Sequence, residues 1–159
     1  MSDLERTRKV VVLCTAGLFC KFLLTSLLQG AKRVRAPEDG FQLLKTKKDD
    51  DKSKEKLFDT EKRWQRIILN DLENIPIGLL LLWGGLIIPS SNNNTTRICS
   101  IVFLVSRILH SFFYIFQLMP WRFFAWLSGL LSIIAHLLIW FLLFFKLFFL
   151  LFIQFKPCK

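Results

Sequence analysis

The stretch Trp121–Phe155, WRFFAWLSGLLSIIAHLLIWFLLFFKLFFLLFIQF, decides the fold class of this 159-residue chain. Its only charged residues are Arg122, close to its start, and Lys146. A helix that crosses a bilayer needs about 20 mostly apolar residues. As one helix this stretch would be roughly 50 Å long, whereas the hydrocarbon layer is about 30 Å thick. We therefore expect a membrane span over residues 121–145 and an apolar tail over 146–159 that tilts, bends along the interface or projects outside.

Three further apolar stretches precede this one, over residues 10–30, 63–88 and 98–118. The chain is 53% hydrophobic with 17 phenylalanines, more than a soluble core of this size could bury. The first stretch is longer than the apolar core of a signal peptide and has no small-residue cleavage site, so we expect it to be retained. The sequence predicts an all-α fold, an integral membrane four-helix bundle that forms a single domain over residues 1–159.

Positive charge is concentrated in the connection between the first two stretches. Of the 22 Lys and Arg residues, twelve lie between Lys32 and Arg66. The positive-inside rule therefore predicts a charged cytosolic loop over residues 32–62, with both termini in the lumen. The few apolar residues in the middle of this loop are typical of a mobile segment. A basic face against anionic headgroups explains the charge better than nucleic-acid binding, so we expect membrane lipid as a partner and no nucleic acid.

The cysteines give no sign of a metal site or a disulfide. Cys14, Cys20, Cys99 and Cys158 form no CxxC pair, and no histidine lies at metal-ligand spacing from any of them. We therefore expect no bound metal.

The second span carries a dense set of polar residues. At 100° per residue, Arg63, Arg66, Asn70 and Glu73 fall within an arc of about 80°, whereas Asp71 points elsewhere, toward a neighbouring helix or subunit. Ionisable residues inside a membrane normally face a bundle interior or a cavity, so each is a candidate site residue.

The third and fourth spans add polar residues at the same end of the bundle. Arg107, His110 and Tyr114 lie within about 60° of arc, and Arg122 opens the fourth span. Together with the second span they predict a site for a small zwitterionic or anionic ligand, because arginine binds carboxylates in bidentate geometry.

Structural roles are the alternative for several of these residues. Arginines near span ends also snorkel to headgroups, and Glu73 could form a salt bridge that only packs helices. Lys21, inside the first span, either snorkels or pairs within the bundle. His136, with Ser128 and Ser132 at four-residue steps, is expected to make hydrogen bonds between helices.

Two motifs resemble the MAPEG family of membrane proteins. The stretches Glu61–Arg66 and Asn70–Asn74, EKRWQR and NDLEN, are similar to its second-helix signature E-R-x-x-R-x-H-x-N-D-x-E-N. Arg107, His110 and Tyr114 resemble the third-helix R-x-x-H-x-x-x-Y, and Arg122 follows Pro120 where the family has a fourth-helix arginine. The resemblance covers about residues 10–145, and the microsomal glutathione transferases and the related membrane prostaglandin E synthase are the most similar branch.

The resemblance implies a homotrimer of the endoplasmic reticulum membrane, or of the mitochondrial outer membrane, that binds glutathione between subunits. It implies Arg122 as the catalytic residue that stabilises the glutathione thiolate. The glutathione contacts it implies are Arg66, Asn70, Glu73, Arg107, His110 and Tyr114. The thiolate would then attack a lipophilic electrophile or reduce a lipid hydroperoxide, two reactions that the sequence does not separate.

Some positions depart from the family pattern. Ile68 replaces the usual histidine, Lys62 replaces a glutamate, and Lys32 or Arg33 is the candidate for a first-helix arginine. These departures leave open a second function, a membrane scaffold or lipid-binding protein without catalysis.

Overall fold

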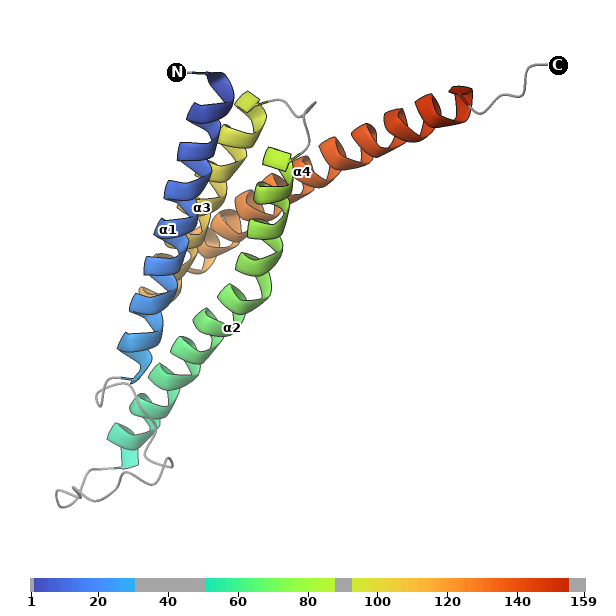
Figure 1. The fold of residues 1–159 in the computed structure, drawn as a ribbon. Helices are drawn as coiled ribbons and strands as arrows, with labels where there is room; N and C mark the ends of the chain where they lie inside the picture. Colours follow the sequence, from blue (N-terminus) through green and yellow to red (C-terminus); the bar gives the residue numbers. More distant parts are fainter. Residues whose placement is uncertain (1, 31–50, 88–92, 155–159) are drawn as a thin grey trace.

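The computed structural model describes residues 2–30, 51–87 and 93–154. They form four helices, α1 (Asp3–Gly30), α2 (Asp51–Ile87), α3 (Asn93–Ile115) and α4 (Met119–Gln154) (Figure 1). Each contains a stretch long and apolar enough to cross a membrane. This confirms the prediction of an all-helical protein with four helices capable of spanning a bilayer. Much of the predicted loop, residues 31–50, lies outside the described residues.

Three helices begin well before the starts that the hydropathy pattern predicts. The first span was expected from residue 10, but α1 begins at Asp3. The expected loop ran to residue 62, but α2 already begins at Asp51. Lysine and glutamate are good helix formers, and an acidic residue at a helix N-terminus is favourable, so a charged stretch can form a solvated helix. Similarly, α3 begins at Asn93, in the polar stretch before residue 98.

The turn between α3 and α4 follows from local backbone geometry. Gln117 has a φ of 60°, in the left-handed region. The backbone N–H of Leu118 donates to the Phe113 carbonyl at 3.0 Å, and that of Gln117 donates to Tyr114 at 3.3 Å, the pattern that ends many α-helices. Pro120 then lies in the first turn of α4, where its missing N–H costs nothing. This tight connection places the end of α3 beside the start of α4.

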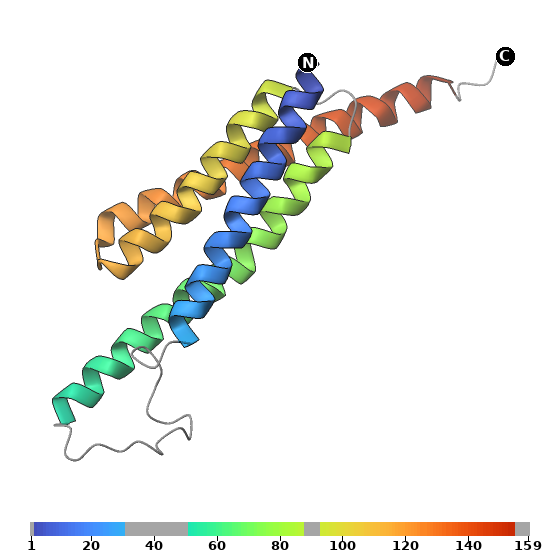
Figure 2. The same ribbon diagram turned by 60° about the vertical axis from the view of Figure 1, so that its left-hand side comes forward.

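The fourth helix continues without a break through Gln154, so the apolar tail up to that residue belongs to the helix. The two ribbon views show α1, α2 and α3 side by side, with α4 running obliquely out of the bundle (Figures 1 and 2). Its apolar part, Met119–Lys146, has 28 residues, or about 42 Å of helix. A helix of this length fits a bilayer when it is tilted. The tail up to Gln154 is therefore a continuous extension of the fourth span.

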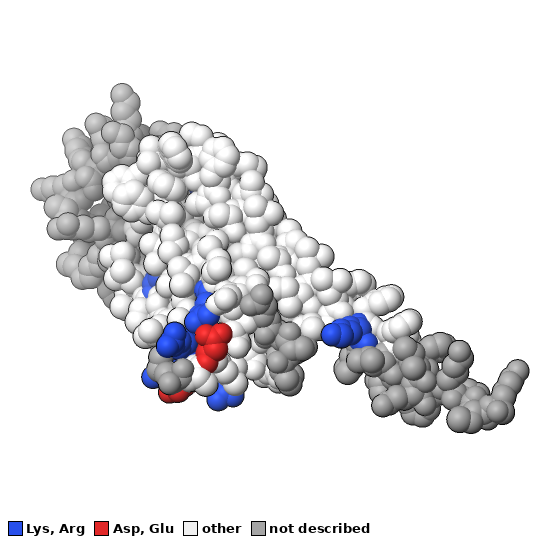
Figure 3. Space-filling view, turned by 90° about the horizontal axis from the view of Figure 1, so that it is seen from above, with Lys and Arg blue, Asp and Glu red and all other residues white. Residues whose placement is uncertain are grey.

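A small apolar core joins the helices. Seven buried side chains form it: Val11, Leu18, Ile75, Leu81, Leu82, Phe103 and Ile133. Glycine allows the closest approach, since a Cβ atom at Gly84 of α2 would overlap the ring of Trp140 of α4. Large apolar side chains on the outer faces are exposed, for example Leu13 and Leu27 of α1 at 70% and 72%. Figure 3 shows one cluster of charged side chains and a separate blue group on the projecting arm, while most of the described surface in this view is uncharged, as expected for a surface in contact with lipid.

His136 differs from expectation. It is buried, but neither ring nitrogen makes a hydrogen bond to another helix among the described residues. Ser128 donates to the Ala125 carbonyl of its own helix at 2.9 Å.

Candidate functional site

Tyr114 and Arg122 are brought together by the α3–α4 turn. The Arg122 guanidinium carbon lies 4.5 Å from the centroid of the Tyr114 ring, close enough for a cation–π interaction. Arg122 Nη2 also lies 3.1 Å from Sδ of Met119, one turn earlier in α4. These two contacts hold the guanidinium at the end of the bundle, where the helix meets the turn.

A polar pocket of about 350 Å³ opens around this pair. It lies between α2 and the α3–α4 turn, and its volume is in the range of small-molecule sites. Its charged lining consists of Asp59, Lys62, Arg63, Arg66 and Arg122. Four cations against one carboxylate make this pocket complementary to an anion. We call it the basic pocket.

A second pocket, of about 550 Å³, shares Arg122 and Met119 with the basic pocket. Four of its lining residues are apolar: Met119, Pro120, Phe123 and Trp126. The remaining two are His110 and Arg122. Arg122 is therefore shared between an anion-complementary pocket and a largely apolar one, which we call the apolar pocket. An anionic group in the first and an apolar molecule in the second would meet at this guanidinium.

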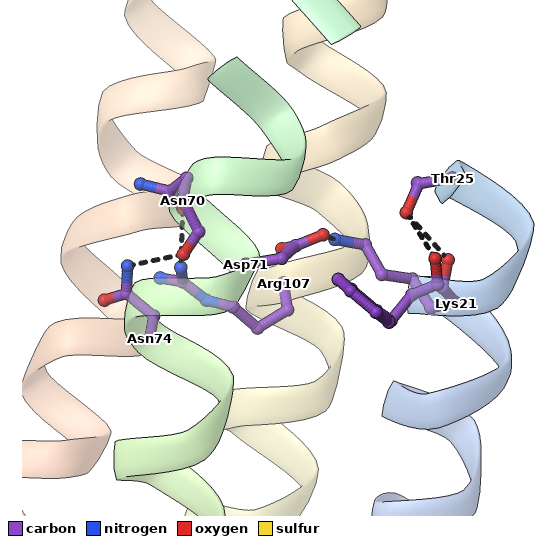
Figure 4. Close-up of polar contacts among 7 residues, drawn as sticks. Lys21, Thr25, Asn70, Asp71, Asn74 and Arg107 are labelled. Carbon is purple, nitrogen blue, oxygen red and sulfur yellow. Dashed lines mark hydrogen bonds and ion pairs between the residues drawn. The ribbon is translucent and has the colours of Figure 1, made fainter. Parts of the chain in front are cut away.

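Asn70 and Arg107 meet inside the bundle. Arg107 is fully buried, and its Nη1 donates a hydrogen bond of 2.9 Å to Oδ1 of Asn70 (Figure 4). Gly129 of α4 makes room for this guanidinium, because a Cβ atom there would lie 2.6 Å from Arg107 Nη2 and 2.7 Å from Ser106 Oγ. Arg107 lines neither pocket of its own chain, and its hydrogen bond links α3 to Asn70 of α2.

An ion pair lies next to this hydrogen bond. Lys21 of α1 is paired with Asp71 of α2, and the two side chains are 9% and 1% exposed (Figure 4). Asp71 thus faces a neighbouring helix, as predicted, and of the two alternatives for Lys21 the structure shows pairing within the bundle. The hydropathy pattern alone did not connect these two residues, since they lie on different helices.

The predicted site residues separate into three groups. Arg66, Tyr114 and Arg122 line the basic pocket, and His110 joins Arg122 at the apolar pocket. Asn70 and Arg107 are bonded inside the bundle. Glu73 is exposed on α2 and lines neither pocket of its own chain.

Sequence reasoning missed several pocket residues. Gln117 belongs to the turn and Met119 and Trp126 belong to α4, and no motif marks them. Asp59 and Lys62 were expected in a loop, and their place on α2 gives them their position at the pocket. No group of three or more potential metal-ligating side chains is found in the parts of the chain that the structure describes.

The comparisons with known proteins agree with the motifs. Residues 11–153 match the profile of the MAPEG family. A search of curated proteins found no match.

Proposed function

The chain belongs to the MAPEG family, whose members include glutathione transferases and related eicosanoid enzymes, and we propose that it is a membrane-bound glutathione transferase. Its substrates would be glutathione and a lipophilic electrophile, and a lipid hydroperoxide could be reduced by the same thiolate. The observation that carries this proposal is the position of Arg122, between a basic pocket and an apolar pocket.

The basic pocket suits the charges of glutathione. Glutathione carries two carboxylates and one ammonium group, and its reactive form adds a thiolate. Arg66, Lys62 and Arg63 would bind carboxylates, while Asp59 would accept the ammonium group. These contacts would orient the peptide so that its sulfur lies near Arg122.

Arg122 would promote the reaction by stabilising the thiolate. A free thiol has a pKa of about 8.5, and a nearby cation lowers the pKa toward neutrality. The sulfur anion would then attack an electrophile in the apolar pocket, forming a C–S bond as the leaving group departs. With a hydroperoxide, the thiolate would instead attack the outer oxygen, breaking the O–O bond to give glutathione sulfenic acid and an alkoxide that takes a proton to leave as the alcohol. A second glutathione would then reduce the sulfenic acid, giving glutathione disulfide and water.

Glu73 and Arg66 favour an assembly of several copies. Both are exposed on a membrane-spanning helix of the single chain, where contact with lipid would be costly. A second copy packed against this face would cover them and would place Glu73 near a neighbouring pocket. We therefore propose the homotrimer of the family, located in the endoplasmic reticulum membrane, with a role in detoxification.

Replacing Arg122 tests this function directly. We expect Arg122→Ala to lower turnover of glutathione with chlorodinitrobenzene by at least about a hundredfold, in line with the loss of a group that stabilises developing charge. The fold and oligomer should be unchanged by size-exclusion chromatography in detergent.

Arg8→Ala is a matched control, because Arg8 is an exposed arginine on α1 outside both pockets. Equal turnover in the wild type and Arg122→Ala would disprove the role of Arg122. A folded wild type that neither turns over nor binds glutathione would favour the scaffold function.

A further inference from the structure

Four side chains from three helices form a continuous polar chain inside the bundle. Lys21 of α1 pairs with Asp71 of α2, and the adjacent Asn70 of α2 accepts a hydrogen bond from Arg107 of α3 (Figure 4). The basic and apolar pockets do not include Lys21 or Asp71. The catalytic scheme above therefore gives neither residue a task.

The choice of partner by Arg107 requires an explanation. A guanidinium binds a carboxylate more strongly than a neutral amide, and this preference grows where water is excluded. Asp71 is close enough to Arg107 for a favourable charge–charge interaction. Nevertheless, Arg107 donates its hydrogen bond to Asn70, and its Nε and Nη2 atoms have no hydrogen-bond partner among the described residues.

Lys21 accounts for this arrangement. Its ammonium group engages Oδ2 of Asp71, so the carboxylate charge is compensated from the α1 side, while Oδ1 of Asp71 has no hydrogen-bond partner among the described residues. In the absence of that ammonium group, the buried carboxylate would have Arg107 as its nearest remaining cation. An unpaired buried carboxylate is costly, so the guanidinium would turn to it.

We propose that Lys21 is a positioning residue of the glutathione site. By occupying Asp71, it leaves Arg107 free to hold Asn70 on the helix that also carries Arg66. This inference rests on the proposed function for its catalytic consequence, because Asn70 is a proposed glutathione contact. The partner choice of Arg107 itself can be tested without glutathione.

The first experiment measures the Arg107–Asn70 hydrogen bond through protein stability. Asn70→Ala is introduced into the wild type, into Lys21→Met, and into the double variant Lys21→Met/Asp71→Asn, and thermal unfolding midpoints are measured in detergent. In the wild type we expect Asn70→Ala to lower the midpoint by a few degrees. In Lys21→Met the same change should have almost no effect, because Arg107 has already moved to Asp71. In the double variant, Asn70→Ala should again lower the midpoint, since no carboxylate at position 71 competes with Asn70 for Arg107.

An equal effect of Asn70→Ala in all three backgrounds would overturn the proposal. If Lys21→Met does not fold, Lys21→Gln takes its place, because glutamine can still donate one hydrogen bond to Asp71. The effect of Asn70→Ala should then be smaller than in the wild type. An unchanged effect in that background would also overturn the proposal.

The second experiment tests whether this polar chain affects the binding of glutathione. We expect Lys21→Met to raise KM for glutathione about tenfold, with a smaller change in kcat, because a binding contact is misplaced while Arg122 is intact. Lys21→Met/Asp71→Asn should restore KM to near the wild-type value, although it lacks the ion pair. A purely structural ion pair predicts the opposite, namely no rescue in the double variant. If the wild type shows no glutathione turnover, the proposed function fails, while the unfolding experiment still decides the role of Lys21.

Discussion

At the scale of single residues, the arrangement around Arg122 is the feature with the clearest chemical consequence. Its guanidinium lies over the ring of Tyr114 and borders two pockets of different character. The aromatic face stabilises the cation without neutralising it, whereas a carboxylate partner would cancel the charge that an anionic ligand needs. Arg122 therefore keeps its charge available to a ligand.

Two substitutions of Tyr114 distinguish the contribution of its aromatic ring from that of its hydroxyl group. Tyr114→Phe retains the ring under Arg122, so we expect kcat/KM to fall by less than about tenfold, the contribution of one hydrogen bond. Tyr114→Ala removes the cation–π contact as well, and a further loss of about tenfold is expected. Steady-state kinetics with glutathione as the varied substrate measure both effects. Equal kinetics for the two variants would show that the ring does not position Arg122.

At the scale of the helices, the contact between α3 and α4 forms the site. The tight turn at Gln117 sets the start of α4, and Gly129 lets α4 approach the buried Arg107. Both features are properties of the backbone: Gln117 adopts a left-handed backbone conformation, and Gly129 has no side chain. Together they determine where Arg122 lies relative to Tyr114 and where Arg107 lies relative to Asn70.

Gly129→Ala tests whether the close packing of α4 against Arg107 matters. The new methyl group would lie 2.6 Å from Arg107 Nη2, so either the guanidinium or α4 must move. We expect a loss of about 1–3 kcal/mol in stability, typical of overpacking, and weaker glutathione binding. Gly30→Ala is the matched control, because a Cβ atom at Gly30 has no neighbour within 4 Å. A lowered unfolding midpoint and a raised KM only in Gly129→Ala would support the account, and wild-type values in both variants would contradict it.

Much of the helical architecture could be predicted from the sequence, because a bilayer imposes a minimum length on every apolar span. Three of the helix starts could not, since Asp3, Asp51 and Asn93 lie in polar stretches that hydropathy places outside the spans. For the site, helical periodicity placed Arg66 and Arg107 on polar faces but could not separate the wall of a pocket from the bundle interior. That distinction depends on how helices pack, as does the partnership of Lys21 with Asp71.

At the scale of the whole molecule, a single chain leaves part of α2 without a suitable environment. Arg66 and Glu73 are exposed along a helix that can span a membrane, beside exposed apolar residues such as Leu69 and Leu72. Lipid suits the leucines but not the carboxylate. The proposed trimer would bury this face and complete each site with a neighbouring copy.

Complementation between chains tests whether sites are shared. Arg122→Ala and Glu73→Leu should each be inactive alone, and co-expression should restore part of the turnover. Restoration is expected because Glu73 lies outside the pockets of its own chain, so some mixed sites would combine an intact Arg122 with an intact Glu73. Each chain carries a different tag, so that mixed complexes can be purified through both tags. The turnover of these complexes measures how much activity is restored. Failure to restore activity in a verified mixed complex would place both residues in the same chain's site.

The central claim is that Arg122 stabilises a glutathione thiolate, and the most direct measurement is ultraviolet difference absorbance of bound thiolate. Glutathione is titrated into the purified wild-type protein at neutral pH and, in parallel, into Arg122→Ala and Arg8→Ala. The account predicts a saturable thiolate signal in the wild type and in Arg8→Ala, and its loss in Arg122→Ala. A thiolate signal of equal size in Arg122→Ala, or no signal in a folded wild type that binds glutathione, would contradict it.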